Sequence, residues 1–196
     1  MTTKNLTLIG AALLALSCTT KNENGFLVIT KMVAPVVTTG STGGTTCTFS
    51  PATDETIFAT VNPGVPPTST KGFRLAAVVE NRLTPNGNQA TGRVNTFDFV
   101  VEQAVVNYEA AGTIAVSIGQ QIVPAIGLVK AQGSAAIGLD LFTPGLTGIP
   151  GPGTPIRVVF HLEGKLLDGS VIHSSEYEYL VTTCGTATCD TTSACP

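Results

Sequence analysis

The two histidines of the chain, His161 and His173, are the first residues to consider for catalysis or metal binding. Both lie in segment 156–181, in which Asp168-Gly169 separates two runs of alternating apolar and polar residues. This pattern predicts a β-hairpin with a two-residue turn and positive φ at both turn positions. The resulting register places His161 on the outer face of the sheet and His173 on its core face. We therefore expect the two imidazoles not to share a metal ion, and we expect no metal site.

The same register divides the whole hairpin into a core face and an outer face. Phe160 is expected to lie opposite Tyr177 with both rings buried, and Glu176 is expected opposite an exposed His161. His173 then lies opposite Gly164. The other expected core pairs are Ile156 with Val181, Val158 with Tyr179 and Leu166 with Val171. The expected outer face consists of Arg157, His161, Glu163, Lys165, Ser174, Glu176 and Glu178.

Carboxylates are the other residues that could catalyse a reaction, since glycoside hydrolysis requires two carboxyl groups about 5–9 Å apart. The candidates are Glu102, Glu109, Glu163, Glu176 and Glu178. An exposed carboxylate outside an apolar pocket has little reason for a raised pKa, and the chain has no tryptophan to stack on a sugar. The chain also lacks a G-x-S-x-G motif, and its glycine-rich segment 148–153 lacks the Lys-Ser/Thr of a phosphate loop. We expect no catalytic residue and no cofactor.

Four of the five cysteines form an even set in the part of the chain after residue 25: Cys47, Cys184, Cys189 and Cys195. The spacings in the tail are C-x4-C and C-x5-C, whereas structural zinc sites favour C-x2-C. In an exported chain such a set favours two disulfides, for which three connectivities exist. We expect one bridge to join the tail to the segment around Cys47 and the other to close a small loop within the tail.

The N-terminus has the pattern of an export signal. Lys4 supplies a positive charge, and residues 6–16 form an apolar run that ends at a small residue and a cysteine, Ser17-Cys18. This run is too short to span a bilayer, which needs about 20 apolar residues, and its length is typical of a signal-peptide core. The following residues, 19–25, are polar. The sequence therefore predicts a signal peptide over residues 1–17.

The residues Ala15-Leu16-Ser17-Cys18 resemble the lipobox of bacterial lipoproteins. The resemblance covers only the first 18 residues, and Ala15 stands where leucine is commonest. It implies that the chain is cut before Cys18 and that this cysteine carries lipid. Two or three acyl chains would hold the protein stably on a membrane. Because Thr19 is not aspartate, the resemblance also implies the outer membrane, whereas without lipidation the protein would be periplasmic or secreted.

The remainder of the chain predicts β-strands separated by Gly- and Pro-rich turns. Expected strands are 26–37, 47–61, 73–83, 94–109, 113–118 and 121–126, followed by the hairpin of 156–181. Segment 128–141 fits a strand or a short helix, although its glycines disfavour a helix. After Val100-Val101 the apolar phase changes, which predicts a β-bulge or a bend. The pattern predicts an all-β, antiparallel β-sandwich with immunoglobulin-like topology, and a jelly-roll or small barrel is the alternative.

Composition narrows the function classes further. Charged residues make up only 12% of the chain and the net charge is −3, with no basic cluster, so nucleic-acid binding is not expected. The expected organisation is a signal peptide (1–17), a lipidated tether (18–25), a β-sandwich (26–183) and a cysteine-containing tail (184–196). We predict a non-enzymatic, lipid-anchored envelope lipoprotein that binds an unidentified protein or glycan or has a structural role. The alternative is a lipid-anchored hydrolase with an unrecognised site.

Overall fold

The structure is a computed structural model, and it describes residues 25–39, 45–55, 58–61, 73–87, 95–143 and 146–183. These residues form strands, turns and loops, and no helix occurs among them. The part of the chain described here thus has no helix long and apolar enough to cross a membrane. Strand-forming segments alternate in burial along their length, as half-buried strands of a sandwich do.

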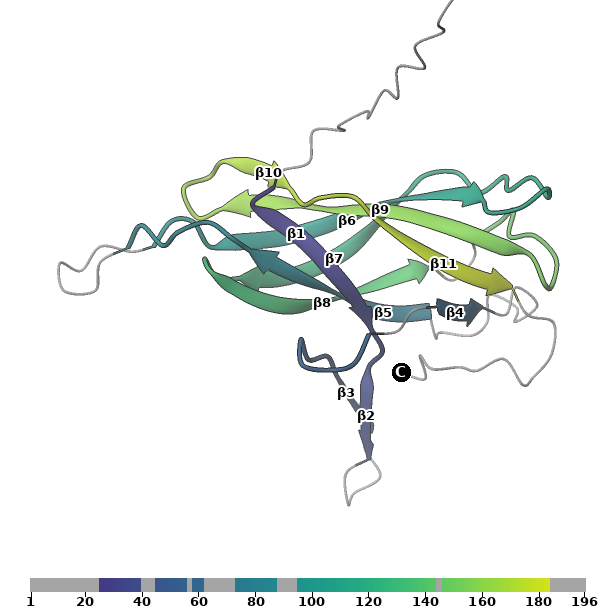
Figure 1. The fold of residues 1–196 in the computed structure, drawn as a ribbon, viewed down its shortest axis with the longest axis horizontal. Coiled ribbons are helices and arrows are strands. Elements are labelled where there is room, and N and C mark those ends of the chain that lie inside the picture. The colour runs from purple at the N-terminus through teal and green to yellow at the C-terminus, as the bar shows by residue number, and fades with distance from the viewer. Residues whose placement is uncertain are drawn as a thin grey trace, which may run out of the picture.

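Two sheets stack against each other and a small third sheet projects from them (Figure 1). The three-stranded sheet has the order β1 (Leu27–Val33), β5 (Phe73–Asn81), β8 (Gly133–Phe142). The six-stranded sheet has the order β4 (Phe58–Val61), β11 (Tyr177–Thr183), β9 (Pro155–Leu166), β6 (Phe99–Ala110), β7 (Gln121–Val129), and β10 (Val171–His173) also pairs with β9. The projecting hairpin consists of β2 (Val36–Thr39) and β3 (Thr45–Thr48). The all-β, antiparallel sandwich expected from the sequence is confirmed, although β4 and β11 pair in parallel.

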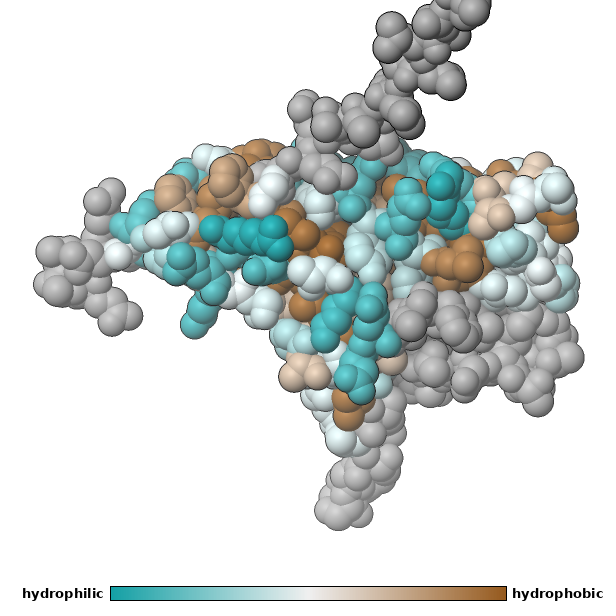
Figure 2. Space-filling model, in the orientation of Figure 1, coloured by the Kyte–Doolittle hydropathy of each residue, from teal (hydrophilic) through white to brown (hydrophobic). Residues whose placement is uncertain are grey.

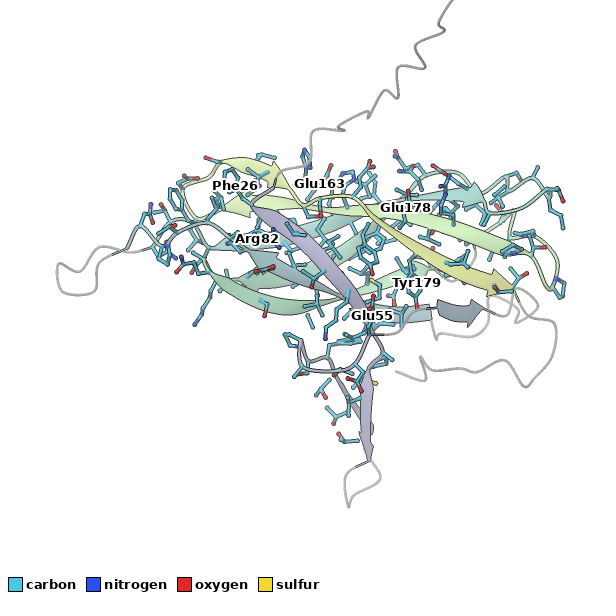
Figure 3. The ribbon with its side chains drawn as sticks, in the orientation of Figure 1. Phe26, Glu55, Arg82, Glu163, Glu178 and Tyr179 are labelled. Carbon is cyan, nitrogen blue, oxygen red and sulfur yellow. The ribbon has the colours of Figure 1, made fainter. Side chains whose placement is uncertain are left out.

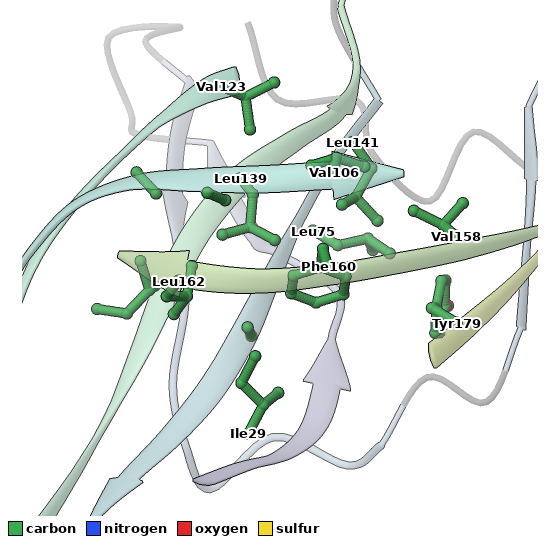
Figure 4. Close-up of a cluster of buried hydrophobic side chains, with 14 of the residues drawn as sticks. Ile29, Leu75, Val106, Val123, Leu139, Leu141, Val158, Phe160, Leu162 and Tyr179 are labelled. Carbon is green, nitrogen blue, oxygen red and sulfur yellow. The ribbon is translucent and has the colours of Figure 1, made fainter. Parts of the chain in front are cut away.

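The core lies between the two larger sheets, where side chains of both interdigitate (Figure 4). Phe160 and Leu162 of β9 meet Leu75 of β5 and Leu139 of β8 in this layer, and all four are fully buried. Burial of such side chains is worth about 1.5–3 kcal/mol each and provides the main stabilisation of the fold.

The bulge predicted in the longest strand is confirmed. The register of β6 shifts between Val101 and Gln103 against both of its neighbours, β7 and β9. Val101 and Ala104 are therefore both buried, although they are three residues apart. The two backbones also approach closely here, because a Cβ on Gly164 of β9 would lie 2.0 Å from the carbonyl oxygen of Val100. Only glycine fits at that position.

Several predicted strand boundaries were wrong. Segment 26–37 is split into β1 and β2 around Pro35, whose ring nitrogen has no N–H to donate to a ladder. Segment 47–61 contains a turn at residues 51–53 between β3 and β4. Segment 113–118 is not a strand, and β7 extends three residues beyond the predicted 121–126. The ambiguous segment 128–141 contains the end of β7 and most of β8, so it is extended rather than helical.

The turn of the hairpin differs from the prediction. Leu166 N donates to Ser170 O (2.9 Å) and Gly169 N donates to Leu166 O (2.9 Å), so the loop has three residues. Of its residues only Gly169 has positive φ, at 90°. This arrangement fits a type I turn that ends in a left-handed glycine. The Asp168 side chain supports the turn, because its carboxylate accepts a hydrogen bond from Ser170 N (2.8 Å).

The longer loop shifts the register of β10 by one residue. Val171 lies opposite Lys165 and His173 lies opposite Glu163, so the predicted pairs Leu166–Val171 and Gly164–His173 are wrong. Residues 174–176 then interrupt the ladder, and the predicted pair His161–Glu176 is part of neither register. Ser174 is buried rather than on the outer face, because its Oγ accepts from Leu162 N (2.9 Å) and donates to Ser175 O (2.9 Å).

Beyond this interruption, β11 has the predicted register. Tyr177 lies opposite Phe160, and the pairs Val158–Tyr179 and Ile156–Val181 are also as expected. Phe160 is fully buried, whereas Tyr177 is only half-buried, with ring centroids 5.9 Å apart. The core face of the hairpin is thus confirmed for β9 and β11, and the errors are confined to the turn and β10.

Candidate functional site

Both histidines lie on the outer face of the six-stranded sheet, next to Glu163 and Gln103. His161 and Glu163 are two residues apart on β9, so they project from the same face. In the observed register His173 of β10 and Gln103 of β6 flank Glu163 from opposite sides. The prediction that the two histidines lie on opposite faces is therefore wrong, because it depended on a two-residue turn. We call these four residues the histidine cluster.

Short contacts connect the four side chains. Gln103 Nε2 donates to Glu163 Oε2 (2.7 Å), and His161 Nε2 lies 3.3 Å from Glu163 Oε1. The rings of His161 and His173 meet edge to face, with centroids 5.5 Å apart. His173 Nδ1 lies 3.0 Å from Ser174 O and must donate its hydrogen, since a carbonyl oxygen can only accept. Each group in the cluster thus has a defined partner and orientation.

The exposure of the two imidazoles is the reverse of the prediction. His161 was expected to be exposed, but its side chain retains only 21% of its accessible area because neighbouring strands flank it. His173 was expected to be partly buried on the core face, but it is exposed. Figure 3 shows Glu163 and Glu178 projecting on the upper side of the ribbon. Because His173 is exposed, the cluster is open to solvent at β10.

The electrostatics of the cluster favour an ionised carboxylate at Glu163. The hydrogen bond from Gln103 lowers the pKa of Glu163, and His161 and His173 lower it further, while partial burial opposes them. A general acid for glycoside cleavage needs a raised pKa, which is the opposite shift. Glu163 is thus suited to accept hydrogen bonds as a carboxylate rather than to deliver a proton.

Other charges on the outer face are paired with one another. Lys165 Nζ lies 2.9 Å from Glu102 Oε1, and Arg157 contacts Glu109 and, at 3.7 Å, Glu178. All of these side chains are substantially exposed, so each pair contributes little to stability. The glutamates considered for catalysis are thus held mainly by basic side chains on the surface.

Strand β7, at the edge of the same sheet, has a row of exposed apolar side chains. Ile122, Pro124, Ile126 and Leu128 alternate with buried or half-buried residues along the strand, and Ile126 keeps 83% of its accessible area. On β6, Val100 lies opposite Leu128 and Val105 lies opposite Ile122. We call the four exposed residues the β7 row. Contiguous exposed apolar side chains of this kind are typical of interaction surfaces.

The face drawn in Figure 2 has hydrophobic side chains in separate patches among hydrophilic ones. Within the described residues, no three His, Cys, Asp or Glu side chains form a group that could hold a metal ion.

Sequence reasoning missed both the contact between the two histidines and the β7 row. The row was readable in the alternation of residues 121–129, whereas the histidine contact depends on a turn type that the sequence left ambiguous.

Tyr179, also labelled in Figure 3, is a buried residue with an unusual polar group. Its hydroxyl makes no hydrogen bond within the part of the chain that the structure describes. Burial raises its pKa, and the neighbouring Tyr177 and Glu55 add to the effect. The hydroxyl is buried and out of reach of solvent, so it is a structural feature and not a candidate catalytic group.

Cys47 is the only cysteine among the described residues. It lies half-buried in β3 opposite Val37, and it is disulfide-bonded. The lipidation candidate Cys18 and the disulfide candidates Cys184, Cys189 and Cys195 lie outside the described residues, as do the predicted signal peptide and tail. The predicted connectivity of two bridges therefore stays a prediction.

No protein-family model matches the chain, and a search of the curated proteins gives no significant match.

Proposed function

We propose that the mature protein is a lipid-anchored envelope lipoprotein whose β-sandwich binds a protein partner without catalysis. The anchor rests on the lipobox-like residues 15–18. The observation that carries the binding role is the β7 row, which exposes four apolar side chains side by side on one sheet face. Exposed apolar area of this kind is costly to keep in water and is retained where a partner covers it. The partner is expected to present an apolar surface of its own.

The partner would bind the face of β7 and not add a strand to its edge. Pro124 lacks the N–H that a strand-adding partner would need, and proline at edge strands is a common device against such pairing. The side chains of Ile122, Ile126 and Leu128 all project from the same face of the strand. Side-chain packing on that face is therefore the binding mode that the residues favour.

The proposed anchor would enter the domain at a fixed point. Arg82 N donates to Phe26 O (2.7 Å) and Ser175 N donates to Leu27 O (2.8 Å), so the start of β1 is held by two neighbouring segments. A tether of residues 18–25 spans at most about 26–29 Å when fully extended. From this point β1 runs across the molecule to the projecting β2–β3 hairpin (Figure 1). The hairpin would then face away from the membrane.

Lipidation is tested on the N-terminus of the protein made in a bacterial host. Mass spectrometry is expected to find a diacylglyceryl group on Cys18, and Cys18→Ala is expected to leave unprocessed or soluble protein. An unmodified N-terminus, cut at another site, would show ordinary secretion and overturn the anchor. Thiol titration of the denatured, unreduced protein accompanies this measurement, and almost no free thiol is expected if both disulfides form.

Partner binding is tested by site-specific photo-crosslinking in cells. A photoreactive residue at Ile126, in the centre of the β7 row, is expected to give a discrete cross-linked adduct. The same residue at Leu180, an exposed apolar position on β11, is the matched control and is expected to give none. An equal pattern at both positions, or no adduct at Ile126, would contradict a binding role for this face.

A further inference from the structure

We propose that the part of the sandwich where β1 begins lies against the lipid surface, with Phe26, Leu167 and Val171 in contact with it. The inference rests on the proposed lipid at Cys18 and deepens it, because it names the surface of the domain that touches the membrane. It does not involve the β7 row. All three side chains are apolar, and Val171 keeps 75% of its accessible area, Phe26 56% and Leu167 48%. We call these three residues the β1–β10 patch.

The three residues come from neighbouring segments of the chain. Ser175, two residues after β10 ends, donates its backbone N–H to Leu27 O (2.8 Å) and so holds the beginning of β1 beside β10. Phe26 directly precedes Leu27, and Figure 3 shows it next to β10. Val171 begins β10, and Leu167 lies in the loop that connects β9 to it. The β1–β10 patch is therefore formed on one side of the molecule, where Figure 2 also shows hydrophobic side chains.

The proposed anchor would bring this patch to the membrane. Residues 18–25 separate the lipid from Phe26 and span at most about 26–29 Å when fully extended. A short linker gives the surfaces that it joins a high effective concentration, so a weak contact between them is enough to persist. Because Phe26 directly follows this tether, the β1–β10 patch begins where the tether ends. A lipid surface is thus the occupant that the position of the patch favours.

The charged groups near the patch suit a shallow contact. Arg82 Nη2 lies 2.9 Å from Glu80 Oε2, and both side chains are about half-exposed. The exposed carboxylate of Asp168 accepts a hydrogen bond from Ser170 N (2.8 Å) within the β9–β10 loop. These groups would stay among the hydrated headgroups while the apolar side chains enter the boundary with the acyl chains. Amphipathic segments that lie on a membrane bury their apolar side chains about 5–10 Å deep, at this boundary.

The test uses the absence of tryptophan from the chain, since one introduced indole then reports on one position. Phe26→Trp and Val171→Trp place it in the β1–β10 patch. Leu180→Trp is the matched control, because Leu180 is also apolar and exposed. Leu180 lies opposite Arg157 near the start of β9, whereas Val171 lies opposite Lys165 near its end. The control therefore stands far from the patch on the same molecule.

The lipidated, oxidised full-length variants are reconstituted in phosphatidylcholine vesicles, with and without brominated phosphatidylcholine, whose bromine atoms quench indole fluorescence within the bilayer. Phe26→Trp and Val171→Trp are expected to emit at shorter wavelength than in detergent-free solution and to lose intensity with the brominated lipid. Leu180→Trp is expected to show neither change. Adding Val171→Asp to Phe26→Trp is expected to abolish the quenching without releasing the protein from the vesicles, because the lipid at Cys18 still holds it. Vesicle flotation measures that attachment, and circular dichroism establishes that each variant is folded.

Mass spectrometry of the same samples separates this inference from the proposed function on which it rests. An unlipidated Cys18 would overturn both. If Cys18 carries lipid and the vesicles carry the protein, but neither Phe26→Trp nor Val171→Trp is quenched, the anchor stands and the membrane contact is wrong. A shifted emission without quenching would assign the patch to a protein interface, such as one with a second copy of the chain. Equal quenching of Leu180→Trp would also contradict a contact confined to the β1–β10 patch.

Discussion

The imidazole of His173 lies against that of His161, edge to face, with ring centroids 5.5 Å apart on the outer face of the six-stranded sheet. The two residues come from different strands, β9 and β10, and Glu163 lies beside both. Both histidines of the chain thus lie together on the solvent-facing side of the sheet, and neither is part of the core. Their imidazoles instead contact each other and the Glu163 carboxylate at the surface.

Phe160→Ala and His161→Ala test the two faces of β9. Phe160 is fully buried between the sheets, and its truncation is expected to cost about 3–5 kcal/mol. His161 is partly buried, but its removal leaves Glu163 hydrogen-bonded to Gln103, so a cost of about 1 kcal/mol or less is expected. Urea unfolding measures both. Equal losses of stability would mean that the register of β9 is wrong.

The register of β9 and β11, together with the β6 bulge, could be predicted from sequence because alternation specifies which face of a strand is buried. The change of phase after Val101 was visible in the same way. The turn could not be resolved, because Asp-Gly fits both a two-residue turn and a three-residue loop in which only Gly169 has positive φ. The interruption at residues 174–176, which restores the register, also has no local signal.

The pairing of β4 with β11 could not be predicted for a different reason. These strands are distant in sequence and parallel, and no turn connects them, so nothing local specifies their register. The histidine cluster shares this limitation, since it depends on the loop length and on Gln103 from β6. The β7 row, by contrast, depends on one strand alone and could have been read from it.

Tyr179→Phe is expected to raise stability by about 1 kcal/mol. The hydroxyl is buried and makes no hydrogen bond among the described residues, so its removal relieves an uncompensated desolvation cost. Tyr108→Phe is the matched comparison, because Tyr108 is also buried but donates to Leu141 O (2.5 Å). The Tyr108→Phe variant is expected to lose about 1–3 kcal/mol of unfolding free energy. Thermal unfolding compares the two variants, and a destabilised Tyr179→Phe would show that its hydroxyl has a partner.

Glu163→Gln is expected to reduce the loss of stability in acid. The pKa of Glu163 is lowered in the folded protein, chiefly by the hydrogen bond from Gln103, whereas in the unfolded chain it lies near 4.3. Ionised Glu163 therefore stabilises the fold above about pH 4.3, and this contribution is lost as the pH falls through the folded-state value. Denaturant unfolding at pH 7 and at pH 3 measures the difference.

One result would contradict this expectation. If Glu163→Gln loses as much stability between pH 7 and pH 3 as the wild type does, the carboxylate has no favourable partners in the fold. Gln103→Ala removes the largest cause of the lowered pKa and is expected to show a smaller reduction in the same direction. Because Glu163 is partly exposed, salt is expected to weaken the effect.

Substitutions in the turn distinguish the observed three-residue loop from the predicted two-residue one. In the observed loop, Gly169 has φ of 90° and open space around its Cα, so Gly169→Ala is expected to cost about 1 kcal/mol through backbone strain alone. Asp168 has negative φ here and its carboxylate accepts from Ser170 N, so Asp168→Gly is expected to destabilise by about 1 kcal/mol as well. A two-residue turn predicts the opposite for Asp168, because glycine would relieve its positive φ. Denaturant unfolding of the two variants distinguishes the two turns. An Asp168→Gly variant more stable than the wild type would favour the predicted two-residue turn and, with it, a register that separates His173 from His161.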